Sequence, residues 1–115
     1  QGTDRLGKAI ARNCEQARYL ERKINDSKTL ELLAPANLNI VCFRYLFDNV
    51  LDINSLNKEI VTRLQEDGVA APSTTVLNGN LAIRVNLTNH RTTFEDLDIL
   101  VSEIEKEGLL LSQKK

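Results

Sequence analysis

The pair Asn78-Gly79, set between two apolar stretches, constrains the fold of this chain more than any other feature. Residues 73–77 and 81–87 flank the pair. An Asn-Gly pair between strands is a strong signal for a β-hairpin, because both residues tolerate a positive φ angle. Side chains in the second stretch alternate between two faces. One face holds Leu81, Ile83, Val85 and Leu87, and the other holds Ala82, Arg84, Asn86 and Thr88.

Two further strands precede this hairpin. Residues 39–45 are apolar at nearly every position, so we expect a central strand that is covered on both faces. A short strand is expected near residues 30–33, before Ala34-Pro35 breaks it. Both Arg44 and Arg84 lie inside apolar strands, where a charge is costly unless a partner compensates it.

Three helices complete the expected elements. The first is capped by Thr3 or Asp4 and ends at residues 25–27; the second starts at Asn54 or Ser55 and runs to Asp67. The third begins after either Thr92 or Thr93, since Thr92 with Glu95 and Thr93 with Asp96 both have capping-box spacing. We expect the following residues to be buried in it: Phe94, Leu97, Leu100, Val101 and Ile104. Gly108 is expected to stop this helix, and residues 112–115 to fray.

The order helix, two strands, helix, two strands, helix predicts an α+β fold. We expect an antiparallel sheet of about four strands with the helices packed on one face. The face that carries Arg84 and Asn86 would then meet water or a partner. At 115 residues the chain forms a single domain, residues 1–115.

Composition excludes several functional classes. The formal net charge is −1 with both signs interleaved, so nothing indicates nucleic-acid binding, and no apolar run is long enough to span a membrane. Cys14 and Cys42 each lie at an apolar position, which favours buried free thiols over a disulfide and a reducing cytoplasm as the location. The chain contains no methionine, and we expect it to be a fragment of a longer protein.

Arg84 is the strongest candidate for a functional residue. On the open side of the sheet its guanidinium could bind a carboxylate or a phosphate through two parallel hydrogen bonds. The alternative is an exposed strand arginine paired with Asp or Glu, or lying over its neighbours. Arg44 is a weaker candidate of the same kind, because its strand does not define an inner and an outer face.

His90 and Arg91 precede the last helix, whose N-terminus is suited to anions. A single histidine in such a loop is usually structural, although histidine also serves as a general acid or base. There is no second histidine to complete a metal site or a catalytic triad, and no glycine-rich phosphate loop. The sequence therefore predicts no catalytic, cofactor-binding or metal-binding residue within this chain.

Several segments resemble the C-terminal part of the pyridoxal-phosphate-dependent group II amino-acid decarboxylases, the family of the aromatic-L-amino-acid, glutamate, histidine and diaminobutyrate decarboxylases. They are residues 6–8, 13–20, 38–45, 81–85, 89–92 and 96–98. The resemblance covers nearly the whole chain in order. The strand ending in Phe43-Arg44-Tyr45 and the run from Arg84 to Thr92 are its more specific parts.

This resemblance implies the small C-terminal domain of a fold-type-I enzyme. In this family a large N-terminal domain holds pyridoxal 5'-phosphate and supplies the Schiff-base lysine. We therefore expect the chain to close the active-site cleft, to bind no cofactor alone and to be inactive alone. The family forms homodimers. By resemblance Arg84 faces the cleft near the substrate, and Arg91 holds the corner at the start of the helix; the substrate amino acid is not readable.

Two other interpretations remain open. One is a small-molecule-binding or regulatory α+β module without catalysis; a ferredoxin-like version of it would need strand-helix-strand repeated twice, which the element order does not show. The other is the equivalent domain of another fold-type-I enzyme, such as an aminotransferase or a desulfurase.

Overall fold

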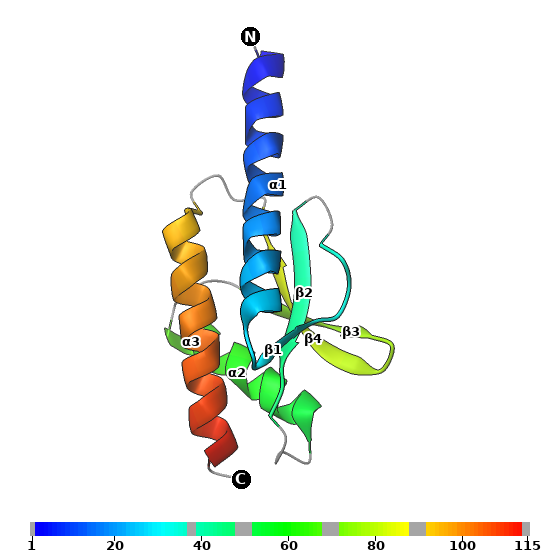
Figure 1. The fold of residues 1–115 in the computed structure, drawn as a ribbon, viewed down its shortest axis with the longest axis vertical. Helices are drawn as coiled ribbons and strands as arrows, with labels where there is room; N and C mark the ends of the chain where they lie inside the picture. The colour runs from blue at the N-terminus through cyan, green and yellow to red at the C-terminus, as the bar shows by residue number, and fades with distance from the viewer. Residues whose placement is uncertain (1, 37–38, 48–51, 68–71, 88–91, 114–115) are drawn as a thin grey trace.

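The computed structural model describes residues 2–36, 39–47, 52–67, 72–87 and 92–113, and the side chains from residue 14 onward except those of residues 66–67. Its elements follow the predicted order (Figure 1). They are α1 (Gly2–Asp26), β1 (Leu30–Leu32), β2 (Ile40–Tyr45), α2 (Ile53–Asp67), β3 (Ser73–Leu77), β4 (Asn80–Asn86) and α3 (Phe94–Gln113). The α+β class is confirmed.

The four strands form one antiparallel sheet with the order β1-β2-β4-β3. The hairpin of β3 and β4 turns at Asn78 and Gly79, whose φ angles of 52° and 83° lie in the left-handed region. This confirms the predicted turn. Since β4 pairs with both β2 and β3, Arg84 lies on an inner strand of the sheet.

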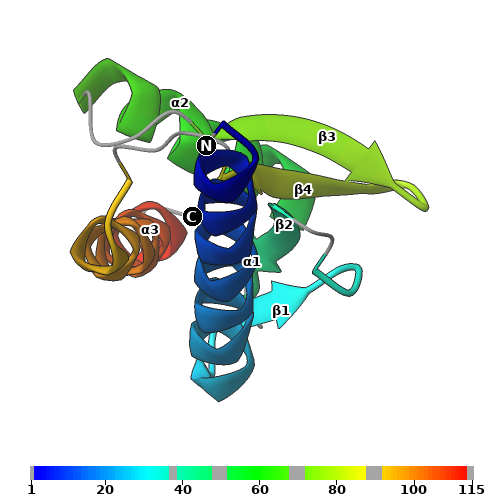
Figure 2. The same ribbon diagram turned by 90° about the horizontal axis from the view of Figure 1, so that it is seen from above.

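All three helices cover the same face of the sheet (Figure 2). The strands contribute Val41, Phe43, Tyr45, Ile83 and Val85 to a core that also contains Leu20 and Ile24 of α1, Leu56, Ile60 and Leu64 of α2, and Leu97 and Ile104 of α3. The prediction that the helices pack on one face is confirmed.

The expectation that β2 is covered on both faces was wrong. Burial alternates along β2, with Val41, Phe43 and Tyr45 buried and the residues between them partly exposed. An apolar residue such as Ile40 therefore lies on the uncovered side, which a sequence pattern cannot distinguish from a second buried face.

Asn57 joins α2 to the end of β2. Its side chain is fully buried: Oδ1 accepts a hydrogen bond from Tyr45 N at 2.7 Å, and Nδ2 lies 3.0 Å from Tyr45 O and 2.8 Å from Ile53 O. A side-chain amide can thus replace the strand partner that the Tyr45 backbone would otherwise need. The cap of α2 is Asp52, which accepts hydrogen bonds from Ser55 N and Ser55 Oγ at 3.1 and 2.7 Å.

The start of α3 settles the choice between the two predicted capping boxes. Thr93 N donates to Asp96 Oδ2 at 2.9 Å and Asp96 N donates to Thr93 Oγ1 at 3.1 Å, which is the reciprocal pattern of a capping box. Phe94 was expected to be buried but is 40% exposed. As the first residue of the helix it lies at the rim, where its ring meets the Tyr19 ring edge-on with centroids 5.0 Å apart.

Gly108 does not stop the last helix, contrary to expectation. Helix α3 continues to Gln113, and Ser112, expected to fray, is only 7% exposed. Gly108 instead faces the Tyr45 ring: a Cβ atom at this position would lie 2.6 Å from Tyr45 Cε2. The missing side chain therefore allows the sheet and α3 to approach closely.

Replacing Gly108 with alanine should lower the free energy of unfolding by about 1–2 kcal/mol, because overpacking outweighs the better helix propensity of alanine. Tyr45 is 1% exposed, so its ring is enclosed by the protein and cannot simply turn into solvent. Urea denaturation of the 115-residue chain measures the change, with the exposed-site variant Lys106→Ala as control. In a Tyr45→Leu background the alanine should no longer destabilise; an equal loss in both backgrounds would contradict this explanation.

Cys14 and Cys42 are both free, as expected, but each is partly exposed rather than buried. None of the helices in the described part of the chain combines the length and the apolar character needed to cross a bilayer.

Candidate functional site

The face of the sheet opposite the helices, which we call the open face, carries the two strand arginines. Strand pairing places Glu31 beside Arg44, and both Cys42 and Ser73 beside Arg84. Directly paired residues of antiparallel strands share a face. The open face therefore presents a row of charged and small side chains across all four strands.

Arg44 is already neutralised within the sheet. Its Nε donates to Glu31 Oε1 at 2.8 Å, and the Arg44 side chain is 19% exposed. Pairing with Asp or Glu was the structural alternative to anion binding that the sequence left open for the strand arginines. Arg44 therefore links β1 to β2 through its Nε, and its charge is balanced by the Glu31 carboxylate.

Arg84 has no such partner in the part of the chain that the structure describes. Its side chain is partly buried on the open face, whereas the adjacent Ile83 and Val85 are buried in the core. In the described residues no hydrogen bond or ion pair engages its guanidinium. The predicted orientation of Arg84 is thus confirmed, and a half-buried cation on an inner strand remains free to bind an anion.

Cys42 lies across from Arg84. Burial raises the pKa of the Cys42 thiol, and the Arg84 charge opposes this shift only in part. The thiolate is the nucleophilic form of cysteine, so a raised pKa makes Cys42 a poor nucleophile. The pair provides charge and shape on the open face but not a reactive group.

The remaining sequence candidates, His90 and Arg91, lie outside the described residues. Thr92, which follows them, is described: its carbonyl accepts a hydrogen bond from Gln16 Nε2 at 2.7 Å. Their predicted role at the start of the helix stays a prediction.

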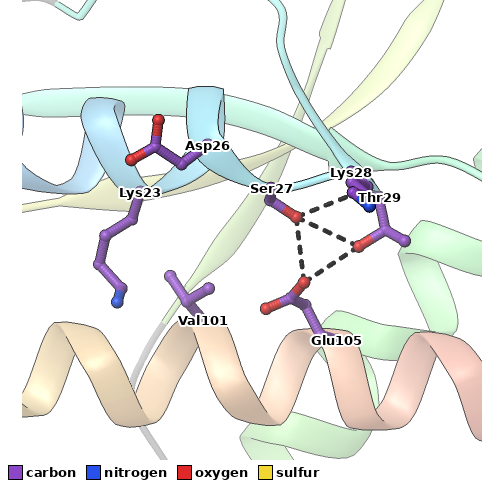
Figure 3. Close-up of a pocket in the computed structure, with 7 residues that line it drawn as sticks. All are labelled: Lys23, Asp26, Ser27, Lys28, Thr29, Val101 and Glu105. Atoms are coloured by element: carbon purple, nitrogen blue, oxygen red, sulfur yellow. Dashed lines mark hydrogen bonds between the residues drawn. The ribbon is translucent and has the colours of Figure 1, made fainter.

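A cavity of about 460 Å³ lies between the end of α1 and α3 (Figure 3). Its lining residues are Lys23, Asp26, Ser27, Lys28, Thr29, Val101 and Glu105. The hydroxyls of Ser27 and Thr29 donate to Glu105 Oε2 at 3.0 and 3.1 Å. These bonds tie the turn after α1 to α3, so most of the polar groups in the cavity already have partners.

Lys23 lines this cavity and is held beside Asp98, whose carboxylate lies 3.0 Å from Nζ. The hydrogen bond with Asp98 is the main reason why the pKa of Lys23 is raised, so this lysine is stabilised as a cation. A lowered pKa is one way in which proteins activate a lysine for Schiff-base formation, and Lys23 does not show it. Within the described residues no cluster of His, Cys, Asp or Glu suits a metal ion.

Contacts between α1 and α3 were not foreseen from the sequence. Tyr19 Oη donates to Asp98 Oδ1 at 2.6 Å, which lowers the pKa of Asp98 and raises that of Tyr19. This bond, the Gln16–Thr92 bond and the Ser27–Glu105 bond form a row of polar contacts between the α1 region and the α3 region. We call this row the polar seam. The partners lie more than 70 residues apart in the sequence, so no local pattern could have paired them.

No protein-family profile matches the chain. A curated relative, the aromatic-L-amino-acid decarboxylase of Bacillus atrophaeus, is 32% identical over 107 residues. This match covers 90% of the chain but 22% of the relative, so the chain spans about a fifth of the length of the protein it matches.

Solved structures agree with this relative. The glutamate decarboxylase domain of a diaminobutyrate-pyruvate transaminase and L-2,4-diaminobutyrate decarboxylase from Vibrio parahaemolyticus has a TM-score of 0.83 and 26% identity. The alignment covers 90% of this chain and 22% of that one. Oryza sativa TDC, solved with PLP, has a TM-score of 0.87 at 20% identity, covering 95% and 24% of the two chains; at this identity it supports the fold alone. In sequence and in fold, the chain matches one segment of the pyridoxal-phosphate-dependent group II amino-acid decarboxylases.

Proposed function

We propose that this chain is the C-terminal small domain of a pyridoxal-phosphate-dependent L-amino-acid decarboxylase. The alignment with the Bacillus decarboxylase carries this proposal, because it covers 90% of the chain and only 22% of the relative. The Vibrio and Oryza structures support the proposal, because the chain matches about a quarter or less of each of them.

The cofactor would be held by the large domain of the longer polypeptide, as the resemblance to the family implies. The contribution of this chain would be to close the active-site cleft, to orient the substrate and to exclude water. The open face is suited to such a role, because Ile40 and Cys42 are partly exposed there. Arg84 adds a cation near where a charged part of the substrate or its supporting side chains would lie.

The proposed partners are the large N-terminal domain of the same polypeptide and a second copy of the enzyme in a homodimer. We propose a cytoplasmic location, consistent with two free thiols in the structure. We propose no nucleic-acid partner and no association with a membrane. The amino acid that is decarboxylated depends on residues outside this chain.

The proposal is tested by the gene sequence upstream of Gln1 and by the protein that it encodes. We expect a large domain with a histidine-lysine pair, and a purified polypeptide that is yellow and releases CO₂ from an L-amino acid. The 115-residue chain alone should form no stoichiometric Schiff base with added pyridoxal phosphate after borohydride reduction. An upstream sequence that encodes no such domain, or a single lysine of this chain that is fully modified, would refute the proposal.

A further inference from the structure

Gln16 is a buried polar residue on the inner side of α1. Its side chain is 1% exposed, and the nearby inner residues Ala17 and Leu20 are apolar. Nε2 donates to Thr92 O at 2.7 Å, but Oε1 is buried and has no hydrogen-bond partner among the residues described. A buried amide with an unmet acceptor is costly, so packing alone would favour an apolar residue of similar size, such as methionine.

The hydrogen bond of Gln16 acts at the junction between β4 and α3. Thr92 precedes the Thr93–Asp96 capping box that starts α3. At the other end of this connection, just after β4, Leu87 N donates to Asn39 O at 2.7 Å. The connection is therefore held at both ends, and Gln16 provides the hold on the α3 side.

We propose that Gln16 is a positioning residue whose amide sets where α3 begins relative to β4, the strand that carries Arg84. The bond reaches across 76 residues of sequence and adds the first contact to the polar seam between α1 and the α3 region. Through it, α1 holds Thr92, the first described residue before α3. The consequence for catalysis rests on the proposed decarboxylase function, whereas the positioning itself does not.

The first experiment uses the 115-residue chain and does not depend on enzymatic activity. Leu97 N donates to Thr93 O at 3.3 Å in the first turn of α3, so its amide exchange reports how well this turn is held. In Gln16→Met, exchange at Leu97 should be about fivefold faster or more, while the melting temperature stays within a few degrees. The matched control is Glu15→Met, the adjacent but exposed position, which should leave Leu97 unchanged.

A second variant, Gln16→Leu, distinguishes loss of the hydrogen bond from a packing defect that only methionine would cause. Both apolar variants should accelerate Leu97 exchange. Unchanged exchange in both would overturn the proposal. A loss of melting temperature above ten degrees in both, or exchange that accelerates equally throughout the domain, would overturn it as well, because Gln16 would then serve general stability.

The second experiment uses the longer polypeptide. With the start of α3 displaced, Gln16→Met should lower kcat about tenfold and leave KM within about twofold, as expected when alignment rather than binding is lost. Unchanged kcat would overturn the catalytic part of the inference. If the unmodified polypeptide releases no CO₂ from any amino acid, the proposed function fails, and the exchange result still decides whether Gln16 positions α3.

Discussion

Replacing Asn57 with leucine should lower the free energy of unfolding by about 3 kcal/mol. The side chain of Asn57 is fully buried and satisfies both Tyr45 N and Tyr45 O, at 2.7 and 3.0 Å. Leucine has a similar volume but no polar atom, so two buried backbone groups would lose their partners, at about 1–3 kcal/mol each. Part of this cost is recovered by burying an apolar side chain in place of an amide.

The measurement is urea denaturation of the 115-residue chain. Asn54→Leu is the matched control, because Asn54 also binds backbone groups, Gly79 O and Leu81 N, but at a less buried position. This variant should cost about 1 kcal/mol, since water can replace the lost bonds there. Equal losses for the two variants would show that the end of β2 is hydrated and that Asn57 is not its main partner.

Replacing Arg84 with alanine in the longer polypeptide should lower kcat/KM about 100-fold and change the melting temperature little. A 100-fold loss corresponds to about 2.7 kcal/mol of transition-state stabilisation. The expectation follows from two features: Arg84 has no ion-pair partner among the described residues, and it lies on the open face that would meet the rest of the enzyme. Removing a cation without such a partner breaks no ion pair within the described part of the domain.

Arg44→Ala provides the comparison on the same face. Arg44 Nε lies 2.8 Å from Glu31 Oε1, and the Glu31 side chain is 42% exposed. Loss of this partly exposed ion pair should cost at most about 1 kcal/mol of stability and little activity. A conservative Arg84→Lys variant should retain less activity than its charge alone would predict, because an ammonium cannot form two parallel hydrogen bonds. If Arg84→Ala lowered the melting temperature strongly and left kcat/KM unchanged, Arg84 would be structural.

Much of the fold could be predicted from local sequence patterns. The Asn78-Gly79 turn, the alternation in β4 and the capping residues before α3 each act over a few residues, so their consequences do not depend on distant contacts. The orientation of Arg84 followed in the same way, because side chains of a strand alternate between its two faces. This local alternation is the reason why the face on which Arg84 lies was predicted correctly.

Other features were decided by contacts between distant segments. Gly108 looked like a helix stop, yet it lies inside α3, and the Tyr45 ring occupies the space of the missing side chain. The apolar run of β2 could not show that one of its faces stays uncovered, because that depends on where the helices pack. Glu31 forms an ion pair with Arg44, and no described residue forms one with Arg84. This difference follows from which residues the strand pairing places side by side, and composition does not reveal it.

The sequence by itself determined the element order, the hairpin and the face on which Arg84 lies, since backbone preference and side-chain periodicity are local properties. Only the tertiary structure decided which arginine is neutralised within the sheet, which residues hold the strand ends and how α1 is bound to the start of α3. The last two outcomes depend on the buried amides of Gln16 and Asn57. Their hydrogen-bond partners become neighbours only after the chain has folded.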